Sequence, residues 1–220
     1  MSTISPRHIS DADVELAALI NSTASLGVTL DARAATQLLM LLDELSRWNK
    51  IYNLTAIGER HDMIVRHLLD SLAVWPLLEG SRVIDVGTGA GFPGLPLAIA
   101  DPHRQFTLLD SNGKKVRFVA HVARTLDLGN VQTVQARAET HTPPLFYDTV
   151  VTRAFAPLPE LLDKVVGLCG PNTLVLAMKG RRQSTEREEL PAQWRIETDR
   201  DLLIPGLARS RHVTAMRRTT

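Results

Sequence analysis

The stretch Val-Ile-Asp-Val-Gly-Thr-Gly-Ala-Gly-Phe-Pro-Gly, residues 83–94, decides the fold. A short apolar strand leads to Asp85, a glycine-rich turn follows at once, and an apolar helix is predicted over 93–100. Glycines let the backbone approach a ligand closely, and the first turn of a helix presents unpaired N–H donors. The pattern therefore predicts the entry to a nucleotide-binding α/β fold.

Two classes of ligand are compatible with this turn. The dinucleotide spacing G-x-G-x-x-G is satisfied by Gly89, Gly91 and Gly94. Asp110 follows at roughly the 20-residue distance expected of an acid that binds a ribose. Pro93 and Pro96 argue against a diphosphate, because proline lacks the N–H group that would bind a phosphate oxygen.

The other candidate ligand is S-adenosylmethionine, which carries no phosphate. Its ammonium group needs an acceptor, such as Asp85 or the carbonyl of Gly87, and its ribose hydroxyls need a carboxylate. Asp110 supplies a carboxylate at the end of the next strand, where open α/β sheets bind their ligands. The spacing and the prolines favour S-adenosylmethionine, with a dinucleotide such as NAD as the alternative.

The composition indicates a globular protein: the 220 residues are 44% hydrophobic and 22% charged, enough for one domain with a sizeable core. A single cysteine, Cys169, excludes an internal disulfide and a cysteine-rich zinc site, and we expect it to be buried in a protein of the reducing cytosol. The sequence has no signal-peptide pattern and no membrane-length apolar stretch. We therefore expect a cytoplasmic protein that binds no membrane. The net charge of +1 still allows a local basic face over 202–220, which contains four arginines and no acid.

Strands and helices alternate from residue 82 onward. The predicted strands are 82–86, 105–109, 131–135, 147–152 and 173–178, and the predicted helices are 93–100, 113–127 and 157–168. Such alternation predicts a mostly parallel sheet covered on both faces. Residues 194–198, 202–204 and 211–217 are expected to add the last strands, with an antiparallel edge. We predict an α/β, Rossmann-like core over 79–220 and an N-terminal helical region over 1–78 that packs on it, as one compact domain.

The N-terminal region is predicted to contain two amphipathic helices. Apolar residues recur at helical spacing over 35–45 after a capping Asp31, and again over 64–75. The segment 48–55 has no clean period and is predicted to be a packed connection.

On the second helix the polar side chains of Arg66, His67, Asp70 and Ser71 fall on one side. Arg66 and Asp70 are four residues apart and His67 and Asp70 are three apart, so each pair can touch. A solvated face with a helical ion pair and a functional cluster both fit this pattern. A hydrolase triad does not, because no serine or cysteine stands in a G-x-S-x-G elbow.

Other polar residues follow the remaining strands. Arg153 ends the strand 147–152 and faces the same crevice as Asp110, so it is placed to contact cofactor or substrate, or else to pair with a local acid. Lys114 and Arg117 on helix 113–127 either track phosphates or form a solvated face. No histidine or cysteine spacing typical of a metal site occurs, and we expect no metal.

Six motifs in order identify a family resemblance. They begin at Trp48 (WNKIYNLT), Arg66 (RHLLDS), Asp85 (DVGTGAGFPG), Leu108 (LLDS), Thr152 (TRAFA) and Met178 (MKG). Together they resemble the bacterial 16S rRNA guanine-N7 methyltransferases, the glucose-inhibited division protein B family, over about residues 30–180. The resemblance implies a class I S-adenosylmethionine-dependent methyltransferase fold and methylation at N7 of guanine 527 in 16S rRNA.

The resemblance also implies roles for individual residues. It marks Gly87, Phe92, Ala138, Glu139 and Arg153 as cofactor contacts. Together with the glycine turn and the end of the second strand, the expected cofactor-binding set is Asp85, Gly87, Gly89, Gly91, Phe92, Asp110, Ser111, Ala138, Glu139 and Arg153. The candidates for binding RNA are Asn53, Arg66, His67, Lys114, Arg117 and Lys179, of which Arg66 and His67 are also the candidate catalytic residues.

The absence of an acid–base motif agrees with this chemistry. Guanine N7 carries an in-plane lone pair and no proton, so its attack on a sulfonium methyl needs alignment and exclusion of water rather than a general base. The expected partner is 16S rRNA or the small ribosomal subunit, bound by a monomer. A small-molecule methyltransferase and a non-enzymatic S-adenosylmethionine-binding regulator are the alternatives.

Overall fold

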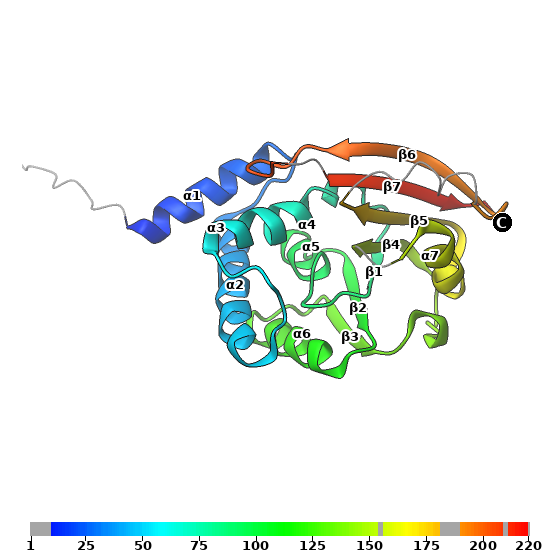
Figure 1. Cartoon of the computed structure of the whole chain (residues 1–220), viewed down its shortest axis with the longest axis horizontal. Coiled ribbons are helices and arrows are strands. Elements are labelled where there is room, and N and C mark those ends of the chain that lie inside the picture. Colours follow the sequence, from blue (N-terminus) through cyan, green and yellow to red (C-terminus); the bar gives the residue numbers. More distant parts are fainter. Residues whose placement is uncertain (1–9, 154–155, 181–189, 209–210, 220) are drawn as a thin grey trace, which may run out of the picture.

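Seven strands form one mixed sheet in the computed structural model, which describes residues 10–153, 156–180, 190–208 and 211–219 (Figure 1). The strands are β1 (Arg82–Val86), β2 (Gln105–Asp110), β3 (Val131–Gln135), β4 (Tyr147–Arg153), β5 (Cys169–Lys179), β6 (Trp194–Leu202) and β7 (Arg211–Arg218). Their order is β3-β2-β1-β4-β5-β7-β6. Strands β1 to β5 pair in parallel, whereas β7 lies antiparallel between β5 and β6. The predicted parallel sheet with an antiparallel edge is confirmed.

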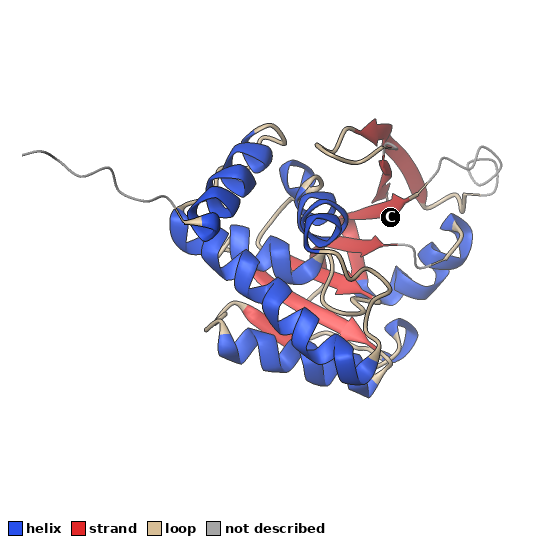
Figure 2. Cartoon of the chain, turned by 60° about the vertical axis from the view of Figure 1, so that its left-hand side comes forward, coloured by secondary structure: helices blue, strands red, loops and turns tan. Residues whose placement is uncertain are grey.

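Helices cover both faces of the sheet (Figure 2). They are α1 (Asp11–Ala24), α2 (Ala32–Tyr52), α3 (Arg60–Met63), α4 (Asp70–Leu72), α5 (Gly94–Ala100), α6 (Gly113–Thr125) and α7 (Leu158–Val165). A π-helical segment, η1 (Ile64–Leu69), joins α3 to α4, and short 3-10 turns are η2 (Trp75–Leu77), η3 (Ala138–Thr140) and η4 (Val166–Leu168). None of the helices within the described ranges is both long and apolar enough to cross a membrane.

Alternate side chains along each strand enter different cores. Val83 and Leu108 point to the side covered by α2, α5 and α6, and Ile84 and Leu109 point to the side covered by α7. This is the period-2 alternation of a sheet buried on both faces. The first core extends from Leu19 of α1 across to strand β7, so the N-terminal helices share it with the strands.

Helix α2 is longer than its sequence pattern predicts. Asp31 caps it as expected, accepting a hydrogen bond from the Ala34 N–H at 2.7 Å. The predicted break at residue 48 is wrong, because the helix continues to Tyr52 and ends where Asn53 turns left-handed (φ 50°). Trp48 packs on Phe118 of α6, and this tertiary contact supports a turn that lacks a clean apolar period.

The predicted helix over 64–75 is interrupted by the π-helical segment η1. His67 is only 5% exposed, and Asp70 and Ser71 are fully buried, so a solvated face is wrong for these three residues. Arg66 is exposed and lies 3.9 Å from Asp62 rather than reaching Asp70. A π-bulge shifts the register of a helix, and here it accompanies polar side chains that face the strands. Such bulges are frequent at functional sites.

Candidate functional site

The glycine turn lies between the ends of β1 and β2. Gly87, Gly89 and Gly91 have positive φ angles of 71°, 61° and 87°, which only glycine adopts without strain. A side chain at Gly91 would collide with Leu95, whereas a Cβ at Gly89 would make only an ordinary contact, with the Gly87 carbonyl oxygen at 3.9 Å. The turn therefore packs tightly on helix α5 at Gly91, and its backbone is accessible at Gly89.

The side chain of Asp85 is hydrogen-bonded to this turn. It is fully buried, and its Oδ2 atom accepts hydrogen bonds from the Thr88 hydroxyl at 2.6 Å and from the Gly94 N–H at 2.8 Å. Its Oδ1 atom is buried without a partner among the described residues. Burial raises the pKa of this carboxyl to about 6.

Asp110 ties the end of β2 to the same turn. Its Oδ2 atom accepts from the Gly89 N–H at 2.9 Å and its Oδ1 atom accepts from the Asn112 N–H at 2.8 Å. Each carboxylate oxygen has more than one lone pair, so both can still accept from a ligand hydroxyl.

A cavity of about 370 Å³ opens at the carboxyl ends of the parallel strands. It is lined by Gly87, Leu109, Asp110, Ser111, Lys115, Ala136, Arg137, Ala138, Glu139, Arg153 and Lys164. Six of the expected cofactor-binding residues are in that lining: Gly87, Asp110, Ser111, Ala138, Glu139 and Arg153. The remaining four, Asp85, Gly89, Gly91 and Phe92, belong to β1 or the turn beside it and are not in the lining. A volume of this size is ordinary for a small-molecule site.

Two lysines in the lining were missed by the sequence analysis. Lys115 lies in the first turn of α6, directly after the loop that follows Asp110. This position close to a predicted site residue could have indicated that Lys115 lines the site. Lys164 comes from α7, where it also pairs with Glu160 at 2.6 Å. Nothing in the local sequence of α7 places it near the turn.

His67 and Arg153 both contact the aromatic ring of Phe92. The imidazole stacks on that ring, and the guanidinium of Arg153 lies 5.6 Å from its centroid. The Nε2 atom of His67 is 3.0 Å from the Thr55 hydroxyl, and Nδ1 is buried without a partner among the described residues. Burial, reinforced by the nearby positive charges of Arg153 and Arg66, lowers the pKa of His67 to about 4, so the ring is neutral at physiological pH.

The buried carboxylate of Asp70 joins two distant arginines. Arg211 donates to it through Nε at 2.6 Å and through a terminal nitrogen at 2.8 Å, and Arg153 donates at 3.1 Å. Arg153 also donates to the backbone carbonyl of Arg66 at 3.1 Å. Arg153 therefore pairs with an acid and also lines the cavity, and its contact with cofactor or substrate stays a prediction. The sequence indicates Arg211 only as one of the arginines in the basic segment 202–220, because 141 residues separate it from Asp70.

The other RNA-binding candidates do not line this cavity. Asn53 is exposed at the end of α2, Lys114 and Arg117 are exposed on α6, and Lys179 is half-buried at the end of β5. Their binding to RNA stays a prediction.

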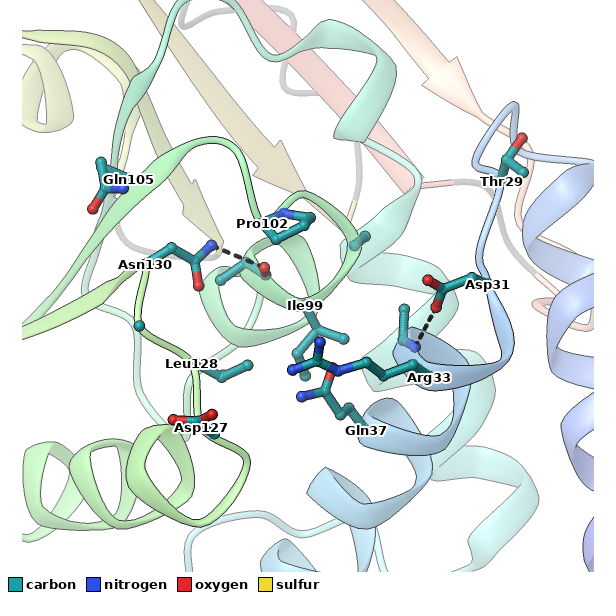
Figure 3. A pocket seen from close by; sticks show the side chains of 14 residues that line it. Thr29, Asp31, Arg33, Gln37, Ile99, Pro102, Gln105, Asp127, Leu128 and Asn130 are labelled. Carbon is teal, nitrogen blue, oxygen red and sulfur yellow. Dashed lines mark hydrogen bonds between the residues drawn. The ribbon is translucent and has the colours of Figure 1, made fainter.

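A larger cavity of about 530 Å³ lies at the opposite edge of the sheet. Figure 3 shows Arg33 and Gln37 of α2 projecting into it. The side-chain amide of Asn130 donates a hydrogen bond to the carbonyl of Ala98 at 3.0 Å. Open α/β sheets bind their ligands at the carboxyl ends of the strands, so the smaller cavity is the candidate site. In the part of the chain that the structure describes, no three histidine, cysteine, aspartate or glutamate side chains gather as a metal site would require.

The strand order with an antiparallel β7, and the glycine turn between two strand-end acids, define a class I methyltransferase. Solved structures share this fold. The N-methyltransferase NodS from Bradyrhizobium japonicum matches with a TM-score of 0.55 and 14% identity, over 74% of this chain and 100% of its own. A protein of the NADB-Rossmann superfamily from Streptococcus agalactiae matches with a TM-score of 0.57 and 12% identity, over 68% of each chain.

The family follows from the sequence comparisons. The family model described as rRNA small subunit methyltransferase G matches residues 34–214. Proteins named Ribosomal RNA small subunit methyltransferase G are 42% identical over all of both chains in Pseudomonas aeruginosa, and 45% identical in Nitrosococcus oceani over 87% of this chain and 90% of that protein. The chain belongs to the rRNA small subunit methyltransferase G family.

Proposed function

We propose that this protein transfers a methyl group from S-adenosylmethionine to N7 of guanine 527 in the 16S rRNA of the small ribosomal subunit. The observation that carries the proposal is the cavity between the glycine turn and Arg153, at the carboxyl edge of a methyltransferase sheet. Membership of the family supports the choice of an rRNA substrate. We further propose that it acts in the cytoplasm as a monomer.

The residues around the cavity fit this cofactor. The open backbone at Gly89 and the carbonyl of Gly87 suit the amino-acid moiety, and the spare lone pairs of Asp110 suit the ribose hydroxyls. Ala138 and Glu139 of η3 line the side that an adenine ring would occupy. We assign Asp85 a positioning role, because its carboxylate is turned into the protein to hold Thr88 and Gly94. When bound, the cofactor supplies an electrophilic methyl group on a positively charged sulfur.

The protein's own groups need only hold the two reactants in line. Guanine N7 offers its lone pair without losing a proton, so no general base is required. The neutral ring of His67 fixes Phe92 and adds no positive charge beside the sulfonium. Arg66, half exposed at the rim, is the candidate for contact with the RNA, with Asn53 and Lys179 as further candidates. Alignment and exclusion of water then lower the barrier.

The decisive experiment uses small subunits and deproteinised 16S rRNA from a strain that lacks this enzyme. Incubation with methyl-labelled S-adenosylmethionine should label one guanine, and chain cleavage at N7-methylguanine should map it to position 527. The two substrates also tell whether the enzyme acts on free RNA or on an assembled particle. Label on no RNA, together with tight binding of NAD and none of S-adenosylhomocysteine, would contradict both the activity and the cofactor.

A further inference from the structure

The helices α2 and α6 are neighbours (Figure 1). Both carry exposed cations: Lys50 near the end of α2, and Lys114 and Arg117 on α6. The last two turns of α2, residues 46–52, contain Arg47 and Lys50 and no acid, and α6 carries four lysines and arginines and no acid. Glu44 of α2 is buried and pairs with Arg47 at 2.7 Å and with His121 at 2.9 Å, and its exposed neighbour Asp43 pairs with Arg60 at 2.8 Å. Lys50, Lys114 and Arg117 form no ion pair among the described residues, so their charges are available to a ligand that approaches from solvent.

Exposed apolar side chains lie among these cations. Ile51 is 73% exposed and Tyr52 is 41% exposed, both in the last turn of α2. The Tyr52 ring packs on the ring of Trp48, and the two ring centroids are 5.3 Å apart. Trp48 in turn contacts the rings of Phe118 at 5.5 Å and His121 at 5.0 Å. A rigidly held, half-exposed aromatic ring offers contact area at little entropic cost.

This surface is continuous with the candidate cofactor site on two sides. On α6, Lys115 lines the cavity itself, and Lys114 and Arg117 lie exposed beside it. After α2, the chain reaches Thr55, whose hydroxyl contacts His67, the residue stacked on Phe92. A polymer whose reacting base enters the site would therefore have its neighbouring units near α2 and α6.

We propose that Lys50, Ile51, Tyr52, Lys114 and Arg117, here called the α2–α6 platform, bind unpaired nucleotides next to the methylated base. Tyr52 and Ile51 stack on a flanking base, and the three cations contact the phosphates on either side of it. Exposed aromatic rings beside cations favour single-stranded RNA, because the faces of the bases are hidden in a duplex. The proposal rests on the proposed function in taking the substrate to be RNA.

Fluorescence anisotropy with a labelled single-stranded RNA and with its duplex form tests the platform on the intact protein. Tyr52→Ala should weaken binding of the single strand by roughly five- to a hundredfold, the range for loss of one stacked base. Tyr52→Phe should bind as the wild type does, because it keeps the ring. Lys50→Ala combined with Arg117→Ala should lower the slope of log affinity against log salt by about 1.4, at about 0.7 per phosphate contact on a single strand.

Two matched controls lie away from the platform: Arg33→Ala, an exposed arginine at the opposite edge, and Leu203→Ala, an apolar side chain 84% exposed beyond β6. Neither should change RNA affinity, and no platform variant should change binding of S-adenosylhomocysteine. Wild-type affinity in Tyr52→Ala, or equal binding of single strand and duplex, would overturn the platform. Loss of labelling of every RNA by the wild-type protein would instead overturn the proposed function.

Discussion

The imidazole of His67 stacks on the ring of Phe92, with centroids 4.6 Å apart and planes inclined by 19°. The guanidinium of Arg153 lies over the same ring of Phe92, 5.6 Å from its centroid. Burial lowers the pKa of His67 most, and the charges of Arg153 and Arg66 lower it further, so this histidine stays neutral. The stack therefore links the π-helical segment to the glycine turn without adding charge to the site.

The first prediction concerns the pH dependence of His67→Gln. The folded-state pKa of His67, about 4, lies below the unfolded value of 6.5, so the unfolded chain binds this proton more readily. His67 therefore lowers the free energy of unfolding as the pH falls from 6.5 to 4, by about 3 kcal/mol in all. The destabilisation caused by His67→Gln should shrink over the same range, measured by urea unfolding at several pH values. A pH-independent difference from the wild type would contradict the prediction.

The second prediction is the opposite trend for Asp85→Asn. The folded-state pKa of Asp85 is raised to about 6, above the unfolded value of 3.8, so here the folded chain binds the proton more readily. The wild type gains stability from this group as the pH falls from 6 to 3.8, by about 3 kcal/mol in all, and the variant does not. In the same unfolding series, Asp85→Asn should therefore become less stable relative to the wild type as the pH is lowered from 6 to 3.8. Between pH 4 and 6 His67 and Asp85 change the free energy of unfolding in opposite directions, so their effects largely cancel in the wild type. If the free energies of unfolding of Asp85→Asn and the wild type change equally with pH, the prediction is wrong.

The third prediction compares two aspartates that both meet arginines. Asp70→Asn leaves Arg153 and Arg211 without their shared buried carboxylate, and breaking a buried ion pair from one side costs about 3–5 kcal/mol. Asp62→Asn, on an exposed pair with a 3.9 Å separation, should cost under about 1 kcal/mol. Denaturant unfolding measures both, and calorimetry with S-adenosylhomocysteine should show weaker binding by Asp70→Asn alone. Equal stabilities of the two variants would show that Asp70 holds neither arginine.

The sequence predicts β1 and β2 well because each is a short apolar run bounded by turns. It divides β6, which is one strand over Trp194–Leu202 rather than separate segments at 194–198 and 202–204, because polar residues interrupt its apolar pattern. It also predicts Asp110 and Arg153 at the cavity, since both close strands at the carboxyl edge. It misplaces the polar side of the second helix, because helical spacing assumes a regular turn and η1 is π-helical. It cannot find the contact of Arg211 with Asp70, since only the antiparallel insertion of β7 next to β5 brings these residues together.

The last prediction separates the two functions of the glycine turn. Gly89→Ala adds a methyl group that makes only an ordinary contact, with the Gly87 carbonyl oxygen at 3.9 Å, but it keeps a left-handed φ of 61°. It should therefore cost only about 1–2 kcal/mol of stability. The added methyl stands where we expect the cofactor, so calorimetry should show S-adenosylhomocysteine binding reduced at least tenfold. Gly91→Ala drives a methyl into Leu95 and should mainly unfold the protein in urea titrations. Gly58→Ala, exposed and free of contacts within 4 Å, is the control for both measurements. Cofactor binding unchanged in Gly89→Ala would contradict the placement of S-adenosylmethionine, because the open side of the turn would then not face it.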